Sequence, residues 1–384
     1  MSWFVVLVLV VILAVHVYTY RRTVHDVFPG RRARRVGAVV VLLLGLLVLA
    51  TFLSRRALSP DAGRLLNYVG YGWLAFALYL ALLLVVGDVV RLVLRTVRGR
   101  PDPDRRRFLA RVIAVAAAVG ALGVVDYGAV AARRPQVDRR EVPLDRLDPA
   151  FDGFTIAAVS DIHLGPLVGR ADLAGIVGMI NGAAPDIVAV VGDLVDGGVE
   201  ELATYAAPLG DLAAPTYFVT GNHEYFSDAA DWVTFLPTLG IRVLRNERVE
   251  IRWGDATLDL VGCDDRTAAG SGVPGHGFDL DAALAGRDPE RAVVLLAHQP
   301  VMVDRAARAG VDLQISGHTH GGQLWPLTDV ALLDQPVLAG LAKVGPTWLY
   351  VTRGVGFWGP PARVGSPPEV TVLTLRTPVG SARP

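Results

Sequence analysis

Short polar motifs follow five apolar runs in the second half of the chain, and they carry seven side chains suited to metal binding. These are Asp161, His163, Asp193, Asn222, His298, His318 and His320. Carboxylate, imidazole and amide oxygen are ligands for divalent first-row metals. Asp161 and His163 are two residues apart, so in an extended chain both side chains lie on one side, and His318 and His320 repeat that spacing. The absence of thiolates among these donors argues against a structural zinc site.

The number of donors predicts two metal ions rather than one. Seven ligands suit two cations that share a bridging carboxylate, with water completing the coordination shells. Two metals about 3.5–4 Å apart stabilise the attacking and leaving oxygens of an in-line displacement and lower the pKa of bound water. The choice among Mn, Fe, Zn and Mg stays open, because the order of affinities does not decide which metal is bound.

The elements that position these donors are expected to be short apolar strands alternating with amphipathic segments. Strands are expected at 154–160, 187–191, 216–220, 292–297, 311–315, 348–352 and 369–375, one or two hairpins within 241–262, and helices at 171–183, near 198–211 and near 301–309. Uninterrupted apolar strands separated by helices predict a sheet covered on both faces. Sites in such sheets form where the carboxyl ends of strands meet loops, and each polar motif follows an expected strand.

The motifs resemble, in order and rough spacing, the five motifs of the calcineurin-like metallophosphoesterase superfamily. They are Asp161-Ile-His163, Gly192-Asp193, Gly221-Asn222-His223-Glu224, His298 and Gly317-His318-Thr-His320. The resemblance covers about residues 150–376 and is greatest to a membrane-associated bacterial phosphodiesterase branch. It implies an α/β fold in which two mixed β-sheets pack face to face with flanking helices, a four-layer αββα sandwich.

The resemblance also implies a role for each residue. Asp161, His163 and His320 would hold the first metal, Asn222, His298 and His318 the second, and Asp193 would bridge them. His223 would be the proton donor to the leaving oxygen, with a structural role beside the ligands as the alternative. Glu224 or Asp196 would orient a ligand or His223. The three remaining histidines, His16, His25 and His276, are expected to be non-catalytic.

The implied reaction is hydrolysis of a phosphodiester or pyrophosphate, and proximity to membrane spans points to a lipid-linked or cell-envelope substrate. The alternative is a membrane signalling or scaffold protein that keeps the domain as a binding module. Modules that have lost catalysis lose ligands, and here all seven are present. Transport is not indicated, because the spans hold few polar residues beyond Asn67, Tyr68 and Tyr71.

The first third of the chain is typical of a membrane protein. Residues 1–20, 36–54 and 65–87 carry no charged residue, and a fourth apolar run covers 112–125 and reaches Ala132 past Asp126. About 20 apolar residues cross a bilayer, and lipid requires that they be helical. A buried core helix stays open for the fourth run. We therefore expect a transmembrane region of about four helices at 1–132, a linker at 133–150, a catalytic domain at 151–376 and a flexible tail at 377–384.

Arginine counts predict the orientation. The loop 21–35 has six arginines and 88–111 has eight, whereas the connection between the second and third runs has three. Positive residues stay on the cytoplasmic side, so everything after the fourth span is expected outside. Asp104-Arg105-Arg106-Arg107-Phe108-Leu109 resembles a twin-arginine export signal, with a plain positive-inside anchor as the alternative. No cleavage is expected after Ala129-Val130-Ala131.

Other features predict little chemistry. Lys+Arg and Asp+Glu are 37 each, so the net charge says nothing about nucleic-acid or acidic partners. No nucleic-acid partner is expected, and the oligomeric state is not predicted. Two G-x-G-x-x-G matches, at 270–275 and 354–359, do not open helices after a first strand, so they are expected to be loops near the site. For Arg353 two roles remain as alternatives, a contact with substrate phosphate or a salt bridge. Cys263, the single cysteine, is expected to be buried.

Overall fold

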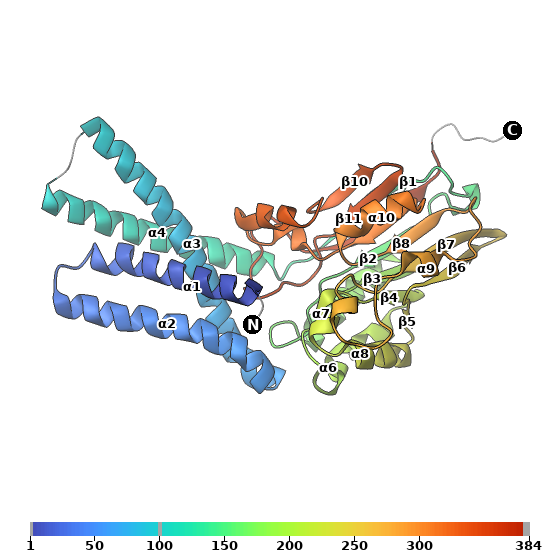
Figure 1. The fold of residues 1–384 in the computed structure, drawn as a ribbon, viewed down its shortest axis with the longest axis horizontal. Coiled ribbons are helices and arrows are strands. Elements are labelled where there is room, and N and C mark those ends of the chain that lie inside the picture. Colours follow the sequence, from blue (N-terminus) through green and yellow to red (C-terminus); the bar gives the residue numbers. More distant parts are fainter. Residues whose placement is uncertain (1–2, 99–101, 379–384) are drawn as a thin grey trace. The chain divides into compact units, whose positions relative to one another are not determined.

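The computed structural model describes residues 3–98 and 102–378 and divides the chain into two compact units. The first, here the helical unit, comprises Met1–Val130 with Gly359–Ala362. The second, here the sheet unit, comprises Ala131–Trp358 with Arg363–Pro384. Each unit has its own packing, and they are described separately (Figure 1).

The helical unit consists of four long helices. They are α1 (Trp3–Tyr20), α2 (Arg31–Ala57), α3 (Pro60–Arg98) and α4 (Pro103–Ala131), with a π-helical turn at Arg21–His25 after α1. Pro60 and Pro103 stand at the first positions of α3 and α4, where a missing N–H leaves no hydrogen bond unmade. All four helices are long and apolar enough to cross a membrane. The fourth apolar run, for which a buried core helix was the alternative, is part of a 29-residue helix whose apolar window is mostly unburied.

Small and polar residues join α2 to α3. A Cβ atom added at Gly70 would lie 2.8 Å from the Thr51 Cβ, so only glycine permits this approach of the two helices. The Asn67 side-chain amide donates to Ser54 Oγ (3.1 Å) and to the Gly63 carbonyl (2.9 Å), and Asn67 is buried. Such small-residue contacts and interhelical hydrogen bonds are typical of helices that associate in lipid.

A charged cluster joins the C-terminal ends of α1 and α3. The Arg22 guanidinium lies 2.8 Å from both Asp26 and Asp88, and Tyr18 donates to Asp88 at 2.8 Å. Arg91 lies 3.5 Å from the other Asp88 oxygen. The cluster therefore holds these two helix ends at the same end of the helical unit.

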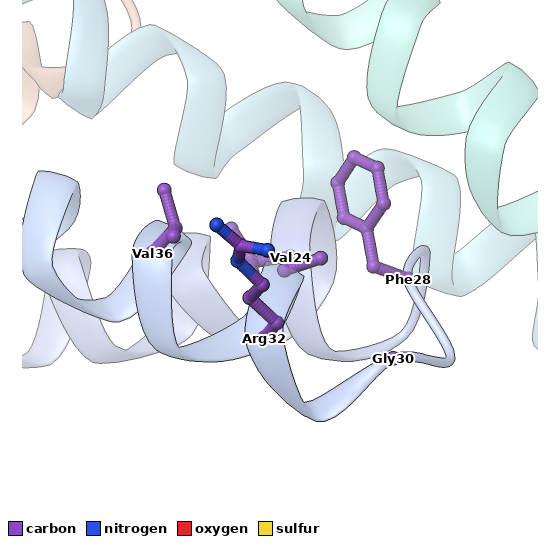
Figure 2. Close-up of a pocket in the computed structure, with 7 residues that line it drawn as sticks. Val24, Phe28, Gly30, Arg32 and Val36 are labelled. Carbon is purple, nitrogen blue, oxygen red and sulfur yellow. The ribbon is translucent and has the colours of Figure 1, made fainter.

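A hollow of about 680 Å³ lies at the turn between α1 and α2 (Figure 2). It is lined by Val24, Phe28, Gly30, Arg32, Ala33, Val36 and Gly37. Figure 2 shows the Val24, Val36 and Phe28 side chains around the Arg32 side chain. The lining contains none of the seven metal donors, so this hollow is not the candidate site.

The sheet unit contains two six-stranded sheets. The first has the order β1-β12-β2-β3-β4-β5, with strands β1 (Gln136–Pro143), β12 (Glu369–Arg376), β2 (Thr155–Val159), β3 (Ile187–Val191), β4 (Thr216–Val219) and β5 (Arg242–Val243). The second has the order β10-β11-β9-β8-β7-β6, with strands β10 (Gly340–Val344), β11 (Thr347–Val351), β9 (Leu313–Ser316), β8 (Val293–Leu296), β7 (Ala256–Gly262) and β6 (Glu247–Trp253). Strands β2 to β5 pair in parallel, as do β7, β8, β9 and β11, whereas β12/β2, β6/β7 and β10/β11 are antiparallel. Both sheets are therefore mixed.

Short helices cover the outer faces of the sheets. They are α5 (Arg170–Ala183), α6 (Val199–Ala206), α8 (Ala229–Phe235), α9 (Leu280–Leu284) and α10 (Val303–Arg308), whereas α7 (Asn222–Phe226) follows the end of β4 and buries Asn222 and Glu224. Short 3₁₀ turns lie at Pro149–Phe151, Ala207–Asp211, Leu236–Leu239, Ala268–Gly270, Pro300–Met302, His320–Gly322 and Leu327–Leu333. The expected helices near 198–211 and 301–309 are each a 3₁₀ turn joined to an α-helix.

Alternation along the strands builds the apolar cores of the sheet unit. In β2, Ile156 and Ala158 join a core shared by both sheets, whereas Ala157 and Val159 pack with Leu173 and other residues of the helices outside the first sheet. A third core joins the outer face of the second sheet to α9 and α10. Because apolar side chains fill both faces of each sheet, the layers are helix, sheet, sheet, helix. The predicted four-layer fold is confirmed.

Two strands were not predicted. Residues 136–143, assigned from sequence to a linker, form β1, which pairs in parallel with β12, and β10 is likewise absent from the expected elements. Most of β1 is exposed and half of its side chains are charged, with only Val142 buried, so it lacks the apolar alternation that marks a strand. Charged side chains are common on edge strands, where they prevent unwanted pairing. At the other end, the Thr377 N–H donates to Asp152 (2.8 Å), and residues 379–384 of the expected tail lie outside the described residues.

Candidate metal centre

The seven donors follow the carboxyl ends of five strands. Asp161 and His163 follow β2, Asp193 follows β3, Asn222 follows β4, His298 follows β8, and His318 and His320 follow β9. In each sheet these strands are parallel neighbours, so their carboxyl ends lie at the same edge. The structure brings six of the donors together in two clusters there, as expected for sites in parallel sheets, and the seventh, Asn222, directly precedes His223, whose backbone N–H donates to Asp193.

The first cluster is Asp161, His163 and His320. One ligand atom from each lies within 4.8 Å of the others. The two Nε2 atoms of His163 and His320 are 3.1 Å apart, and Asp161 Oδ1 lies 3.3 Å from His320 Nε2 and 4.0 Å from His163 Nε2. All three side chains are buried. Three ligand atoms that converge in this way fit one cation.

The second cluster is Asp193, His298 and His318, with ligand atoms again within 4.8 Å of one another. Asp193 Oδ2 lies 3.1 Å from His298 Nε2 and 3.9 Å from His163 Nε2 of the first cluster. Asp193 thus stands between the clusters, where a bridging carboxylate is required. The His298 Nδ1 atom donates to the Val191 carbonyl (2.8 Å), so the lone pair of the ring is on Nε2.

Two buried atoms at this centre need a partner that the described residues do not provide. The Asn222 side-chain oxygen makes no hydrogen bond with any described residue, and neither does His298 Nε2, which lies 3.1 Å from Asp193 Oδ2 but has no N–H to donate because the ring proton is on Nδ1. A buried polar atom without a partner costs about 1–3 kcal/mol, so native proteins rarely leave one. Both atoms carry lone pairs suited to a divalent metal, and the residues therefore fit a two-metal centre.

The backbone at the donors is strained. Asp161, His163, Asp193, His318 and His320 have φ angles between 51° and 72°, in the left-handed region that side chains other than glycine rarely adopt. Each such residue costs of order 1–3 kcal/mol and persists only where the surroundings hold it in place. Strain at five of the seven donors shows that the fold places these side chains against local preference, as it does at functional sites.

Glu224 holds two donor loops together. Its buried carboxylate accepts hydrogen bonds from the N–H groups of Asp193 (3.0 Å), Leu194 (2.8 Å) and Gly221 (2.6 Å). It stands at the third position of α7, where a glutamate can bond back to the residue before the helix. Burial and, after it, the Asp193 carboxylate raise the pKa of Glu224 to about 7. The sequence left Glu224 and Asp196 as alternatives for a supporting role. In the structure, Glu224 bonds to the backbone of the two loops that carry Asp193 and Asn222.

Asp196 supports two histidines at once. Its Oδ1 atom accepts from His223 Nδ1 at 2.6 Å and lies 3.2 Å from His163 Nδ1. The backbone N–H of His223 donates to Asp193 Oδ1 (2.8 Å), so His223 lies beside the Asp193 carboxylate. The ring of His223 lies between Phe226 and Trp358, with centroids 5.4 and 5.8 Å away. These contacts fix the tautomer of His223, with the proton on Nδ1 and proton transfer left to Nε2.

The charges at the centre are coupled. Burial acts to raise the pKa of Asp193, but the charges of His298 and His223 outweigh it and hold that pKa well below its usual range. Asp193 is therefore a carboxylate, as a bridging ligand must be.

Arg363 was missed by the sequence analysis. It is fully buried, its guanidinium lies 3.2 Å from His320 Nδ1, and it donates to the carbonyls of His320 (2.9 Å) and Arg353 (2.7 Å). Burial and then the Arg363 charge lower the pKa of His320 well below its usual value. Arg363 lies 43 residues after His320 and outside every motif, so no sequence signal marked it.

The remaining candidates have structural roles. Arg353 forms a salt bridge with the buried Glu369, which decides between its two alternatives. A Cβ atom at Gly354 (φ 71°) would lie 2.7 Å from the Asp161 Cβ, so this glycine lets the loop pack against the donor motif. His276 bonds to the Tyr225 hydroxyl (3.0 Å). The Cys263 side chain is fully buried, and burial raises its thiol pKa.

Comparison with known proteins agrees with this geometry. The family model of the calcineurin-like phosphoesterases matches residues 154–322. A "Transmembrane protein with metallophosphoesterase domain" from Bos taurus is 38% identical over 381 residues, covering 94% of this chain and 86% of that protein. The protein with the same description from Danio rerio is 36% identical with the same coverage.

Bacterial relatives are similar as well. An uncharacterized metallophosphoesterase from Helicobacter pylori is 34% identical over 278 residues, covering 71% of this chain and 73% of that protein. The vertebrate similarity extends through both units, whereas the family model falls within the sheet unit and spans all five donor motifs. The chain accordingly belongs to the calcineurin-like metallophosphoesterases, enzymes that hydrolyse phosphoester bonds.

Proposed function

We propose that this metallophosphoesterase hydrolyses a phosphodiester or pyrophosphate bond with two divalent cations, at the outer surface of a membrane. The observation that carries the proposal is the convergence of four strand ends on two adjacent donor clusters, with Asp193 between them and Asn222 following a fifth strand. The alternative of a binding module without catalysis is disfavoured, because such modules lose ligands and none of the seven donor residues is missing from the chain.

The residues divide between two positions. Asp161, His163 and His320 would hold one cation, and Asn222, His298 and His318 would hold the other, with Asp193 shared. Cations there supply Lewis acidity, a lowered pKa for the attacking water and neutralisation of phosphate charge. The donors alone are compatible with Mn, Fe, Zn or Mg.

His223 would be the proton donor to the leaving oxygen. The His223 Nδ1–H donates to Asp196 Oδ1, and the two heavy atoms are 2.6 Å apart. The proton that His223 transfers is therefore the one on Nε2. Attack of water on phosphorus breaks the bond to one ester oxygen, and that oxygen takes the proton from His223. The rings of Phe226 and Trp358 keep the imidazole in place during this transfer.

The activity test uses the full-length protein in detergent. With Mn²⁺ we expect turnover of bis(p-nitrophenyl) phosphate, its loss with EDTA, and two equivalents of metal per chain by elemental analysis. A folded protein that hydrolyses neither this diester nor a pyrophosphate with Mn, Fe, Zn or Mg would contradict the proposal.

The outer location rests on the helical unit. Arg22, Asp88 and Arg91 hold the ends of α1 and α3 at one end of the helical unit, and the arginine-rich loops follow those ends. Positive loops stay inside, so α4 would carry the chain outside. The twin-arginine-like Arg105-Arg106 pair lies in the first turn of α4 and would direct this export.

Cysteine labelling tests the location. Arg252 is 78% exposed in its side chain and Cys263 is fully buried, so Arg252→Cys provides one reactive thiol. We expect an impermeant maleimide to label it in intact cells. Labelling only after lysis would place the sheet unit inside, and unchanged export of an Arg105→Lys/Arg106→Lys variant would exclude the twin-arginine pathway.

A further inference from the structure

Large apolar side chains are exposed in one part of the sheet unit. They form what is here named the apolar rim: Phe226, Trp325, Leu327, Val330, Leu332, Leu333 and Trp358. Leu333 is 87% exposed, Phe226 70% and Trp325 62%. Among the described residues of the sheet unit, the other large apolar side chains of comparable exposure are Val137 and Trp253, both on edge strands.

The apolar rim adjoins the metal centre. Phe226 and Trp358 flank the His223 ring. Gln323 joins Trp358 to the rest of the rim, because its amide donates to the Trp358 carbonyl (3.1 Å) and its side-chain oxygen accepts from the Trp358 N–H (3.1 Å). Trp325 follows two residues later. The rim therefore runs from the candidate proton donor along the segment after His320.

The composition of this segment is unusual for a surface. From Leu324 to Leu333 the only charged residue is Asp329, and most of the 3₁₀ turn Leu327–Leu333 is exposed. Soluble proteins seldom expose a continuous apolar patch, and such a patch beside polar groups marks a surface that meets lipid or another apolar partner. Tryptophan is favoured where apolar and aqueous phases meet.

The partner that fits is a lipid bilayer. The same chain has four helices long and apolar enough to span one, and its relative from Bos taurus covers both units in one transmembrane protein. We propose that the apolar rim enters the surface of the bilayer and that the phosphoester hydrolysed belongs to a membrane lipid. This inference rests on the proposed phosphoesterase function. The hydrocarbon part of the lipid would stay with the rim while its phosphate reaches the metal centre beside His223.

A depth measurement tests the rim without any assay of activity. Because Cys263 is buried, Leu333→Cys in the full-length protein takes a single nitroxide label. In nanodiscs we expect the label to be relaxed more by oxygen, which concentrates in lipid, than by a water-soluble nickel chelate. Trp253→Cys, also on an exposed apolar position, is the matched control and should show the opposite preference.

Other labelling results would overturn the inference. Preference of the label at 333 for the nickel chelate would place the rim in water. Protection from both reagents would mean that protein covers it, either the helical unit or a second copy of the chain.

Kinetics test the substrate class. A diacylglycerol p-nitrophenyl phosphodiester in nanodiscs is compared with bis(p-nitrophenyl) phosphate in solution. For Trp325→Ser/Leu333→Ser we expect the ratio of kcat/KM values, lipid over soluble, to fall about tenfold, since removing two interfacial side chains weakens lipid engagement. Trp253→Ser should keep the wild-type ratio, and thermal melting checks that each variant is folded.

The outcomes separate the two proposals. Hydrolysis of neither substrate by the wild-type protein would remove the proposed function and the lipid substrate together. The rim inference alone would be overturned if the wild-type protein hydrolyses the soluble diester but the double variant keeps the wild-type ratio of kcat/KM values, lipid over soluble.

Discussion

The two units distribute apolar and polar side chains in opposite ways. In the sheet unit, apolar residues fill the cores, and six of the buried ionisable groups, Asp161, His163, Asp193, Glu224, His298 and His320, lie at the strand ends of the metal centre. In the helical unit, large apolar residues such as Leu65 and Leu53 face outward, whereas His16, Thr51 and Asn67 are buried. Each distribution suits a different solvent, water for one unit and lipid for the other. The apolar rim is the part of the sheet unit that follows the pattern of the helical unit.

The difference also changes what a buried polar group contributes. In the sheet unit, a polar group bonds to water when the chain unfolds. If its partner is removed from the folded state, the group stays buried without a hydrogen bond, and the folded state carries the full cost of its desolvation. In the helical unit the separated helices remain in lipid, where polar groups find other partners, so the net contribution is small. Comparable substitutions in the two units should therefore differ severalfold in their effect on stability.

The largest effect is expected for Glu224→Ala. Four backbone N–H groups bond to Glu224, those of Asp193, Leu194, Val195 and Gly221, and they would stay buried without this acceptor. At ~1–3 kcal/mol each, the free energy of unfolding should fall by roughly 5 kcal/mol, and thermal unfolding followed by circular dichroism measures it. Glu247→Ala, on a partly exposed side chain, should change it by less than about 0.5 kcal/mol. Equal effects of the two would refute the loop-holding role.

Asp193→Asn should come next, acting on activity. Loss of the shared carboxylate should lower kcat/KM for a phosphodiester about a thousandfold, or ~4 kcal/mol, and reduce bound metal below two per chain. Asp186→Asn is the matched control, because Asp186 accepts from the Thr155 N–H and hydroxyl (both 2.7 Å) at the start of a strand instead. Full metal content with full activity in Asp193→Asn would remove Asp193 from the bridging role.

His223→Gln should lower kcat about a hundredfold, or ~2.7 kcal/mol, while two metal ions stay bound. Glutamine can keep a bond to Asp196 but cannot transfer a proton. His276→Gln, at a histidine that bonds to Tyr225, should retain activity. If metal content falls with activity in His223→Gln, the residue is structural and the proton-donor role is wrong.

The smallest effect is expected in the helical unit. Asn67→Leu removes the bond to Ser54 (3.1 Å), which should change stability in detergent by only ~0.6 kcal/mol. Sodium dodecyl sulfate titration of the full-length protein measures this. A loss as large as that of Glu224→Ala would show that the two units follow the same energetics, and the comparison above would fail.

The sequence predicted the parts of this molecule that are local and apolar. Strand β3 is an uninterrupted run of Ile and Val with Ala, so its burial and its end at Asp193 could be read directly. Strand β1 could not, because the pairing with β12 joins residues more than 200 positions apart and half of its side chains are charged. Arg363 escaped for a similar reason: its partners are carbonyls and one histidine ring, and those contacts exist only after folding.

The single thiol has a consequence for where the enzyme can work. Cys263 is fully buried and its pKa is raised, so it is neither a nucleophile nor a ready target of oxidants. With no second cysteine in the chain, no intramolecular disulfide can form and none has to be kept reduced. The redox poise of its compartment should leave the folded sheet unit unaffected, in a reducing cytosol or an oxidising envelope alike.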